Sequence, residues 1–173
     1  IDKSVRRSQM DLIDQLSQYD YQMTGDPEIL SKISQYEMAY RMQDSVPEVT
    51  NLSDEPSYIL DMYGPQVHQP GTFARNCLLA RRLIERGVKY INLVQVGWDH
   101  HNGIARRHPS DCWAVDQPSA ALVTDLKQRG LLDDTLVTFK GEFGRTVYAQ
   151  GGINPNCGRD HHGGNFTVWM AGG

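Results

Sequence analysis

The chain has 173 residues, of which 39% are hydrophobic and 22% charged, and its formal net charge is −4. This length is sufficient for one ordinary domain with its own core, and the composition is typical of a soluble globular protein. The weakly acidic balance and the scattered arginines exclude a basic nucleic-acid surface, and the apolar runs are too short to span a bilayer.

The two ends of the sequence predict an internal fragment of a larger domain. There is no initiating Met, and residues 166–173 have the pattern of a buried strand that runs into a turn. Natural termini rarely fall at the end of a core strand, because that strand needs neighbours. Any targeting signal would then lie upstream.

Residues 1–63 are predicted to form a helical segment that packs on the main domain. Apolar residues recur there at helical spacing, interrupted by a Gly-Asp-Pro break at residues 25–27. A second break is expected at residues 45–47, before a short segment over residues 57–63. We find no chemistry in this first part of the chain.

Two further helices are predicted after residue 71. An apolar stripe indicates one that ends at Gly87, with Arg82 facing water. The other is expected to begin with Asp116 as its cap and to end at Gly130.

Runs of β-branched and aromatic residues predict three strands, at residues 88–96, 135–139 and 166–170. Because these strands alternate with helices or loops, we expect an α/β fold over residues 64–173. The sheet would be mostly parallel, with helices on its faces.

Polar clusters lie beside the predicted strands. They are Gly-Trp-Asp-His-His at 97–101, Gly-Glu-Phe-Gly-Arg at 141–145 and Gly-Arg-Asp-His-His at 158–162. The carboxyl ends of parallel strands meet at one edge, where α/β proteins bind ligands. Carboxylates and imidazoles together suit a divalent metal ion, which activates water for hydrolysis at phosphorus or sulfur.

Two arginines of these clusters, Arg145 and Arg159, can pair with an anionic substrate through their planar guanidinium groups. The clusters can equally be turn or capping residues without chemistry. On that alternative Glu142 is a loop residue paired with Arg145.

The cysteines predict little chemistry. Cys77 falls in an apolar helical stripe and is expected in the core. The absence of a Cys-x-x-Cys motif argues against a cysteine zinc site. A disulfide between Cys112 and Cys157 in an oxidising compartment stays open.

Residues 62–173 resemble a bacterial family, abundant in planctomycetes and usually labelled sulfatases, of the alkaline phosphatase-like superfamily. Several motifs in the same order carry the resemblance; they are residues 63–65, 73–82, 85–88, 97–101, 125–137, 141–146 and 158–161. The first third of the chain fits the family more loosely. The resemblance implies an alkaline phosphatase-like fold.

The resemblance also implies a ligand set. One divalent metal would be held by Asp99, His101 and His161, and a second by Glu142 with residues from an upstream segment. His100 stays an alternative ligand to His101. The metal would be zinc, manganese, calcium or magnesium, and the nucleophile would lie upstream, so that this chain alone should not turn over substrate.

The function implied is an exported, metal-dependent hydrolase of sulfate or phosphate esters, acting on a small anionic ester or a sulfated glycan. Phe143 stands where many relatives have His or Asn. This departure supports the alternative of a non-catalytic relative that binds metal, a glycan or a partner protein. The oligomeric state stays open.

Overall fold

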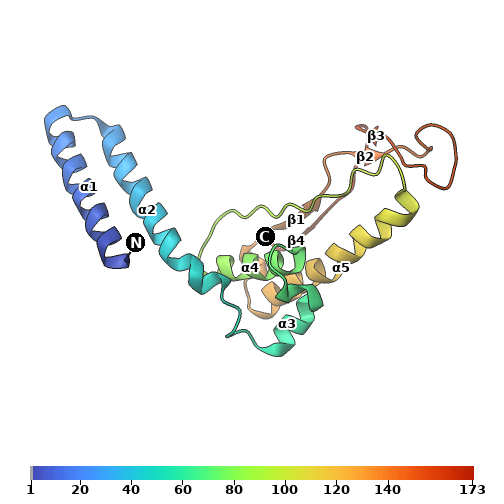
Figure 1. Ribbon diagram of the computed structural model, residues 1–173, viewed down its shortest axis with the longest axis horizontal. Helices are drawn as coiled ribbons and strands as arrows, with labels where there is room; N and C mark the ends of the chain where they lie inside the picture. The colour runs from blue at the N-terminus through green and yellow to red at the C-terminus, as the bar shows by residue number, and fades with distance from the viewer. Residues whose placement is uncertain (1) are drawn as a thin grey trace. The chain divides into compact units, whose positions relative to one another are not determined.

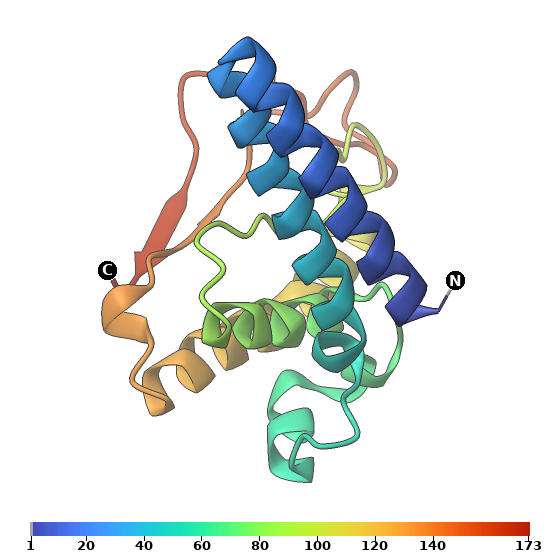
Figure 2. The same cartoon turned by 90° about the vertical axis from the view of Figure 1, so that its left-hand side faces the viewer.

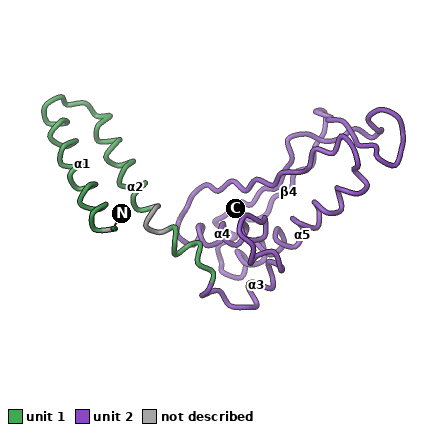
Figure 3. Tube along the Cα trace, in the orientation of Figure 1, with its two compact units in different colours: residues 1–52 green, residues 53–173 purple. Residues whose placement is uncertain are grey.

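The computed structural model describes residues 2–173, except for the side chains of residues 3 and 42–45. Contacts along the chain divide it into two compact units, residues 1–52 and residues 53–173 (Figure 3). The short helix over residues 57–63 therefore lies in the second unit. Each unit is described by itself below.

The first unit is a helical hairpin of α1 (Lys3–Thr24) and α2 (Pro27–Thr50), which run side by side in Figures 1 and 2. Gly25 ends α1 in a left-handed conformation, and the Asp26 side chain accepts a hydrogen bond from the first turn of α2. The break predicted at residues 45–47 is wrong, because α2 continues through Pro47. One proline removes one backbone hydrogen bond, which a helix can tolerate.

Helices make up most of the second unit. They are α3 (Ser57–Tyr63), the 3-10 helix η1 (Pro65–His68), α4 (Phe73–Glu85), α5 (Ile104–Gln128) and the 3-10 helix η2 (Leu132–Asp134). Their inward faces bury an apolar core that includes Tyr63, Val67, Cys77, Leu78 and Leu126. Burial raises the pKa of the Cys77 thiol to about 12, as expected for a core cysteine.

The helix predicted to end at Gly87 is confirmed as α4. The Thr72 side chain caps its first turn, and Gly87 follows its end with a φ of 80°. The expectation that Arg82 faces water is wrong, since only 4% of it is exposed. Its guanidinium pairs with Glu55 at 2.5 Å and with Asp54 at 3.2 Å.

A second buried arginine lies at the centre of the helical core. Arg81 is 2% exposed and pairs with Glu55 at 2.7 Å, Glu85 at 2.8 Å and Asp125 at 2.9 Å. The Tyr63 hydroxyl donates to Asp125 at 3.1 Å. These partners come from α3, α4, α5 and the segment before α3, so the network connects elements far apart in the sequence.

The helix predicted from Asp116 begins much earlier, at Ile104, and contains Pro109 and Pro118 in its interior. Proline is unfavourable inside a helix, but α5 continues through both prolines. Packing of the apolar face of α5 against α4 offsets the backbone hydrogen bonds that the prolines cannot make.

The predicted α/β fold with a mostly parallel, alkaline phosphatase-like sheet is wrong. The chain is mostly helical, at 56% of residues, with two small antiparallel sheets of two strands each among the described residues. Strand β1 (Val137–Lys140) pairs with β4 (Val168–Ala171), so the strands predicted at 135–139 and 166–170 exist but run in opposite directions. Parallel neighbours need a crossover, usually a helix, and residues 141–167 contain none.

Residues 88–96 do not form the predicted strand. Their burial still alternates, with Ile91 and Leu93 half-buried and Tyr90 and Val94 exposed, as an extended backbone requires. A strand also needs a hydrogen-bonded neighbour. No described segment forms such a ladder with residues 88–96.

Candidate metal centre

The polar clusters meet in a loop region of the second unit, where residues 156–159 lie against residues 100–104. Asn102 and Cys157 form an isolated antiparallel bridge, and the Arg159 amide donates to the His100 carbonyl at 3.0 Å. Gly158 lies between these two contacts. A Cβ there would overlap the backbone of His100 and His101, so the approach requires glycine.

A short pair of strands joins the polar cluster at 141–145 to the one at 158–162. Strand β2 (Gly144–Arg145) pairs with β3 (His161–His162), and the Thr146 amide donates to the Asp160 carbonyl at 3.0 Å. Gly144 permits this approach, because a Cβ would overlap the Asn165 backbone. Backbone hydrogen bonds between loops therefore place His161 opposite residues 99–101.

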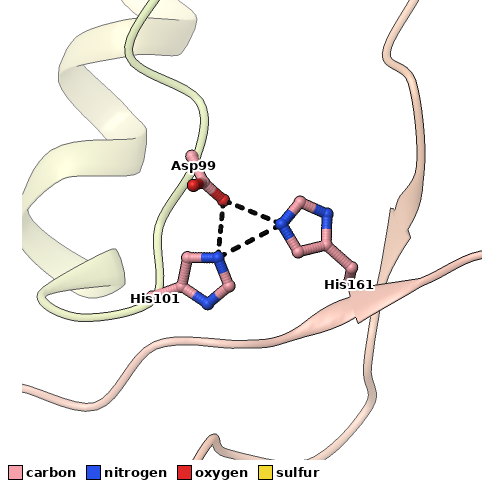
Figure 4. Close-up of side chains that lie close together, drawn as sticks. All are labelled: Asp99, His101 and His161. Atoms are coloured by element: carbon pink, nitrogen blue, oxygen red, sulfur yellow. Dashed lines mark hydrogen bonds and ion pairs between the residues drawn. The ribbon is translucent and has the colours of Figure 1, made fainter.

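Three side chains converge at the centre of this arrangement (Figure 4). The Asp99 Oδ1 atom lies 2.8 Å from His101 Nε2 and 3.2 Å from His161 Nε2, and the two Nε2 atoms are 3.2 Å apart. These residues form the group of potential metal ligands found among the described residues. The Asp99 side chain is 63% exposed and the histidines about half as much, so solvent reaches the group.

The size of this triangle fits a metal ion. With zinc bonds of roughly 2.0–2.1 Å in a tetrahedral site, neighbouring ligand atoms lie about 3.3 Å apart. Two of the three observed edges, at 3.2 Å, are close to this value, and the third, at 2.8 Å, is shorter. An ion about 2 Å from all three atoms would lie about 1 Å above their plane, which leaves its outer side open to further ligands.

Arg145 fixes the charge of the Asp99 carboxylate. Its Nη2 atom donates to Asp99 Oδ1 at 2.7 Å, and this hydrogen bond, helped by the nearby histidines, lowers the pKa of Asp99. Asp99 therefore stays ionised, as a metal ligand must be.

The two predicted anion-binding arginines occupy different positions. Arg145 also donates to the carbonyls of Trp98 at 3.3 Å and Arg159 at 3.2 Å, so three of its five N–H groups bind the loops themselves. It connects the two sides of the site. The Arg159 side chain is exposed, and its backbone holds the loop contact with His100.

The structure separates His100 from His101. His100 is 2% exposed, with Nδ1 2.8 Å from the Trp98 carbonyl and Nε2 2.8 Å from Asp111 Oδ2. Burial lowers the pKa of His100, and the nearby Asp111 carboxylate opposes this shift. His101 alone of the two points at Asp99 and His161.

Glu142 lies outside the ligand group and is exposed. Its neighbour Phe143 packs edge-on against the His161 ring, with ring centres 5.7 Å apart. Asp160 accepts a hydrogen bond from the His161 amide at 2.8 Å, while His162 is exposed beside it. The second metal site predicted at Glu142 gains no further ligand within the described residues.

Sequence reasoning missed a polar neighbour of the ligand group. The Gln150 side-chain oxygen lies 2.6 Å from His101 Nδ1. Gln150 sits in an irregular, turn-rich stretch about 50 positions along the chain from His101, and no local pattern connects the two.

Comparison with protein families shows to which family the chain belongs. A single family model matches residues 1–173, that is, all of it. The chain belongs to the family described as Protein of unknown function (DUF1501). Neither the curated proteins nor the solved structures contain a match to this DUF1501 chain.

The resemblance to a sulfatase family of the alkaline phosphatase-like superfamily is therefore wrong. The family that matches is one of unknown function, and the helical, antiparallel architecture lacks the parallel sheet that the resemblance implied. The expectations of export and of an upstream nucleophile came only from that resemblance and lose their support. No helix among the described residues of the DUF1501 chain is long and apolar enough to cross a membrane.

Proposed function

We propose that this DUF1501 chain binds one divalent metal ion through Asp99, His101 and His161, and that the ion serves the hydrolysis of a small anionic ester. The convergence of three potential ligand atoms within 3.2 Å of one another supports the proposal. One atom is a carboxylate oxygen and two are imidazole nitrogens. Zinc takes both kinds of ligand in proteins.

The donor set favours zinc over manganese, calcium or magnesium. Calcium and magnesium prefer oxygen ligands, whereas imidazole nitrogen suits zinc and other transition metals. Two nitrogens and one carboxylate oxygen also match the three protein ligands typical of catalytic zinc sites. Structural zinc sites usually have four protein ligands and no open position.

An ion held in this way would bind water or a substrate oxygen at its open positions. It would polarise the phosphorus or sulfur centre and lower the pKa of bound water. Hydrolysis then joins the water oxygen to phosphorus or sulfur and breaks the ester bond. One water proton ends on the leaving alcohol and the other on the released acid or solvent.

An anionic ester fits the charges around the ligand group. Arg145 is 2.7 Å from Asp99, and two of its five N–H groups are not used by the three hydrogen bonds described above. Arg159 has an exposed side chain, and its backbone amide makes the loop contact with the His100 carbonyl. Guanidinium groups bind phosphate and sulfate through paired N–H donors.

A non-catalytic role is the second candidate. A metal ion at this position would join two segments 60 residues apart, and the loops around it have little regular structure. The ion would then stabilise the loops without turnover. Zinc binding that raises thermal stability but supports no hydrolysis favours this candidate.

Zinc titration by calorimetry tests the metal site, with the hydrolysis of p-nitrophenyl phosphate and p-nitrophenyl sulfate as the readout of activity. We expect one zinc per chain in the wild type. Asp99→Asn and His161→Ala should each lose most of the affinity, and the double variant all of it. His162→Ala is the matched control, since His162 neighbours His161 but lies outside the ligand group.

Equal zinc binding in the wild type and the double variant contradicts the metal site. A wild type that binds zinc but hydrolyses neither ester rejects the hydrolase and leaves the non-catalytic role.

A further inference from the structure

We infer that helix α1 carries a docking surface for a second copy of this chain, which packs antiparallel against it. The surface, called the α1 seam, consists of Val5, Leu12, Leu16, Tyr19 and Met23. The inference does not depend on metal binding, because the α1 seam belongs to residues 1–52 and the proposed ligands belong to residues 53–173.

The α1 seam is an apolar face that remains exposed. Between 49% and 70% of the surface of each of its five residues is exposed. A helix that packs on one neighbour normally has a single apolar face, with polar side chains on the opposite side. A row of large apolar side chains in solvent is typical of an interaction surface.

The opposite face of α1 already has a partner. Met10, Ser17 and Tyr21 are half-buried there, and Arg7 pairs with Glu37 of α2 at 3.1 Å. At about 100° per residue, these α1 positions lie on the side of the helix away from the α1 seam. The α1 seam is therefore not needed to hold the helical hairpin together.

The spacing of the α1 seam is that of a coiled coil. From position 12 to position 23 its residues follow steps of four, three and four, and Val5 lies seven residues before Leu12. In a heptad labelled a to g, Leu12 falls at d and Leu16 at a, while Gln9 is the polar residue at an a position. The row covers about three heptads, which is short, so we expect a reversible dimer.

The charges beside the α1 seam favour an antiparallel partner. Arg6 and Asp20 both occupy e positions, on the same flank of the helix. Reversing one helix brings this flank of both copies together, and Arg6 of each copy then faces Asp20 of the other. A parallel pair would place this flank against the g positions, where Ser8, Gln15 and Gln22 carry no charge. Charges at e and g positions determine the orientation of paired helices.

One antiparallel alignment matches the apolar residues as well. Leu12 and Leu16 share a midpoint at position 14, and so do Val5 and Met23. A two-fold axis at this position therefore pairs leucine with leucine and valine with methionine. Gln9 and Tyr19 have the same midpoint, so the polar residue of the row meets a side chain with a hydroxyl group.

Sedimentation equilibrium of the full chain over a wide range of concentrations tests the docking surface. We expect the mass to rise from the 19.5 kDa of one chain toward twice that value. Leu16→Glu places a carboxylate in the middle of both seams, and it should stay monomeric where the wild type is a dimer.

Leu30→Glu is the matched control for Leu16→Glu. Leu30 is also an exposed leucine of the same hairpin, but it lies on α2 outside the α1 seam. This variant should dimerise like the wild type. Both substitutions are at exposed positions, so circular dichroism should show wild-type helix content in each.

A charge exchange tests the orientation. Arg6→Glu turns two attractive contacts of the antiparallel dimer into repulsive ones, and we expect the dissociation constant to rise about tenfold. Adding Asp20→Lys to the same chain restores opposite charges and should recover most of the lost affinity.

The inference is overturned if the wild type stays monomeric at every concentration, or if Leu30→Glu dissociates the dimer as much as Leu16→Glu does. A dimer that is insensitive to Arg6→Glu, or that Asp20→Lys does not rescue, contradicts the antiparallel orientation and overturns the inference as stated.

Discussion

The helical core and the metal centre of residues 53–173 are stabilised in different ways. The core buries apolar side chains and a connected set of charges around Arg81, all carried by helices or by the segment that leads into α3. The metal centre lies in loops, where backbone hydrogen bonds and close glycine contacts bring the chain segments together. Its ligands are partly exposed, whereas Arg81, Glu55 and Asp125 at the centre of the core network are buried.

This difference suggests a division of roles. The buried charges of the core have protein partners for nearly every group, which fixes the helices relative to one another. The ligand group is partly exposed and has one arginine, Arg145, as its counter-charge, so we expect it to take up a cation from solvent. Changes in the core should therefore alter stability, and changes in the loops should alter metal binding first.

The largest expected effect is on the free energy of unfolding when Arg81 is replaced. Arg81→Met removes the cation that the buried Asp125 and Glu55 carboxylates share, and leaves Asp125 with Arg129 and Glu55 with Arg82. Removing one partner of a buried ion pair costs about 3–5 kcal/mol, and we expect a loss at the lower end of this range in urea unfolding, because each carboxylate keeps one arginine. Zinc affinity of the folded fraction should be unchanged.

An exposed ion pair provides the control for Arg81→Met. Arg41 pairs with Glu37 at 3.1 Å, with the Arg41 side chain 76% exposed. Arg41→Met should cost less than about 1 kcal/mol, since surface pairs contribute little. Equal losses for the two variants would contradict the assignment of the Arg81 network to the core.

A smaller effect on stability and a larger one on metal binding are expected at Gly158. A Cβ in Gly158→Ala would overlap the backbone of residues 100–102, and overpacking of this kind costs about 1–3 kcal/mol. The overlap would also push residues 99–101 away from His161. We therefore expect zinc affinity, measured by calorimetry, to fall toward that of His161→Ala.

Gly152→Ala is the matched control for Gly158→Ala. A Cβ at Gly152 meets no atom within 4 Å, and both its stability and its zinc affinity should remain those of the wild type. If Gly158→Ala bound zinc like this control, the close approach of the loops would not be what assembles the site.

The helices were the most predictable part of the fold, because their signals are local. The apolar stripe, the Thr72 cap and Gly87 define α4 within 16 residues of sequence. The start of α5 was not predictable in the same way, since tertiary packing overrides the signal of its two prolines. Arg82 was misplaced because its partners, the exposed Asp54 and the buried Glu55, lie far from it in sequence.

The sheet could not be predicted from strand patterns alone. Residues 135–139 and 166–170 have strand composition, but composition does not determine direction or partner. Direction depends on the connection between the strands, and that connection has no crossover helix. Residues 88–96 have strand composition as well and still lack a paired neighbour among the described residues.

The residues of the metal centre were predictable in part. Local patterns identified the clusters at 97–101 and 158–162, but they could not choose between His100 and His101. That choice came from a family resemblance that proved wrong, although the structure does bring Asp99, His101 and His161 together. Gln150 was missed, because only the folded loops bring it into contact with His101.

The central claim is that Asp99, His101 and His161 bind one ion directly, and X-ray absorption at the zinc edge of the loaded protein tests it most directly. The account predicts two imidazole nitrogens and one carboxylate oxygen at roughly 2.0–2.2 Å, with water filling the rest of the shell. The imidazole scattering should weaken in His161→Ala and persist in His162→Ala. A shell of oxygens only, or one that is identical in both variants, would contradict the account.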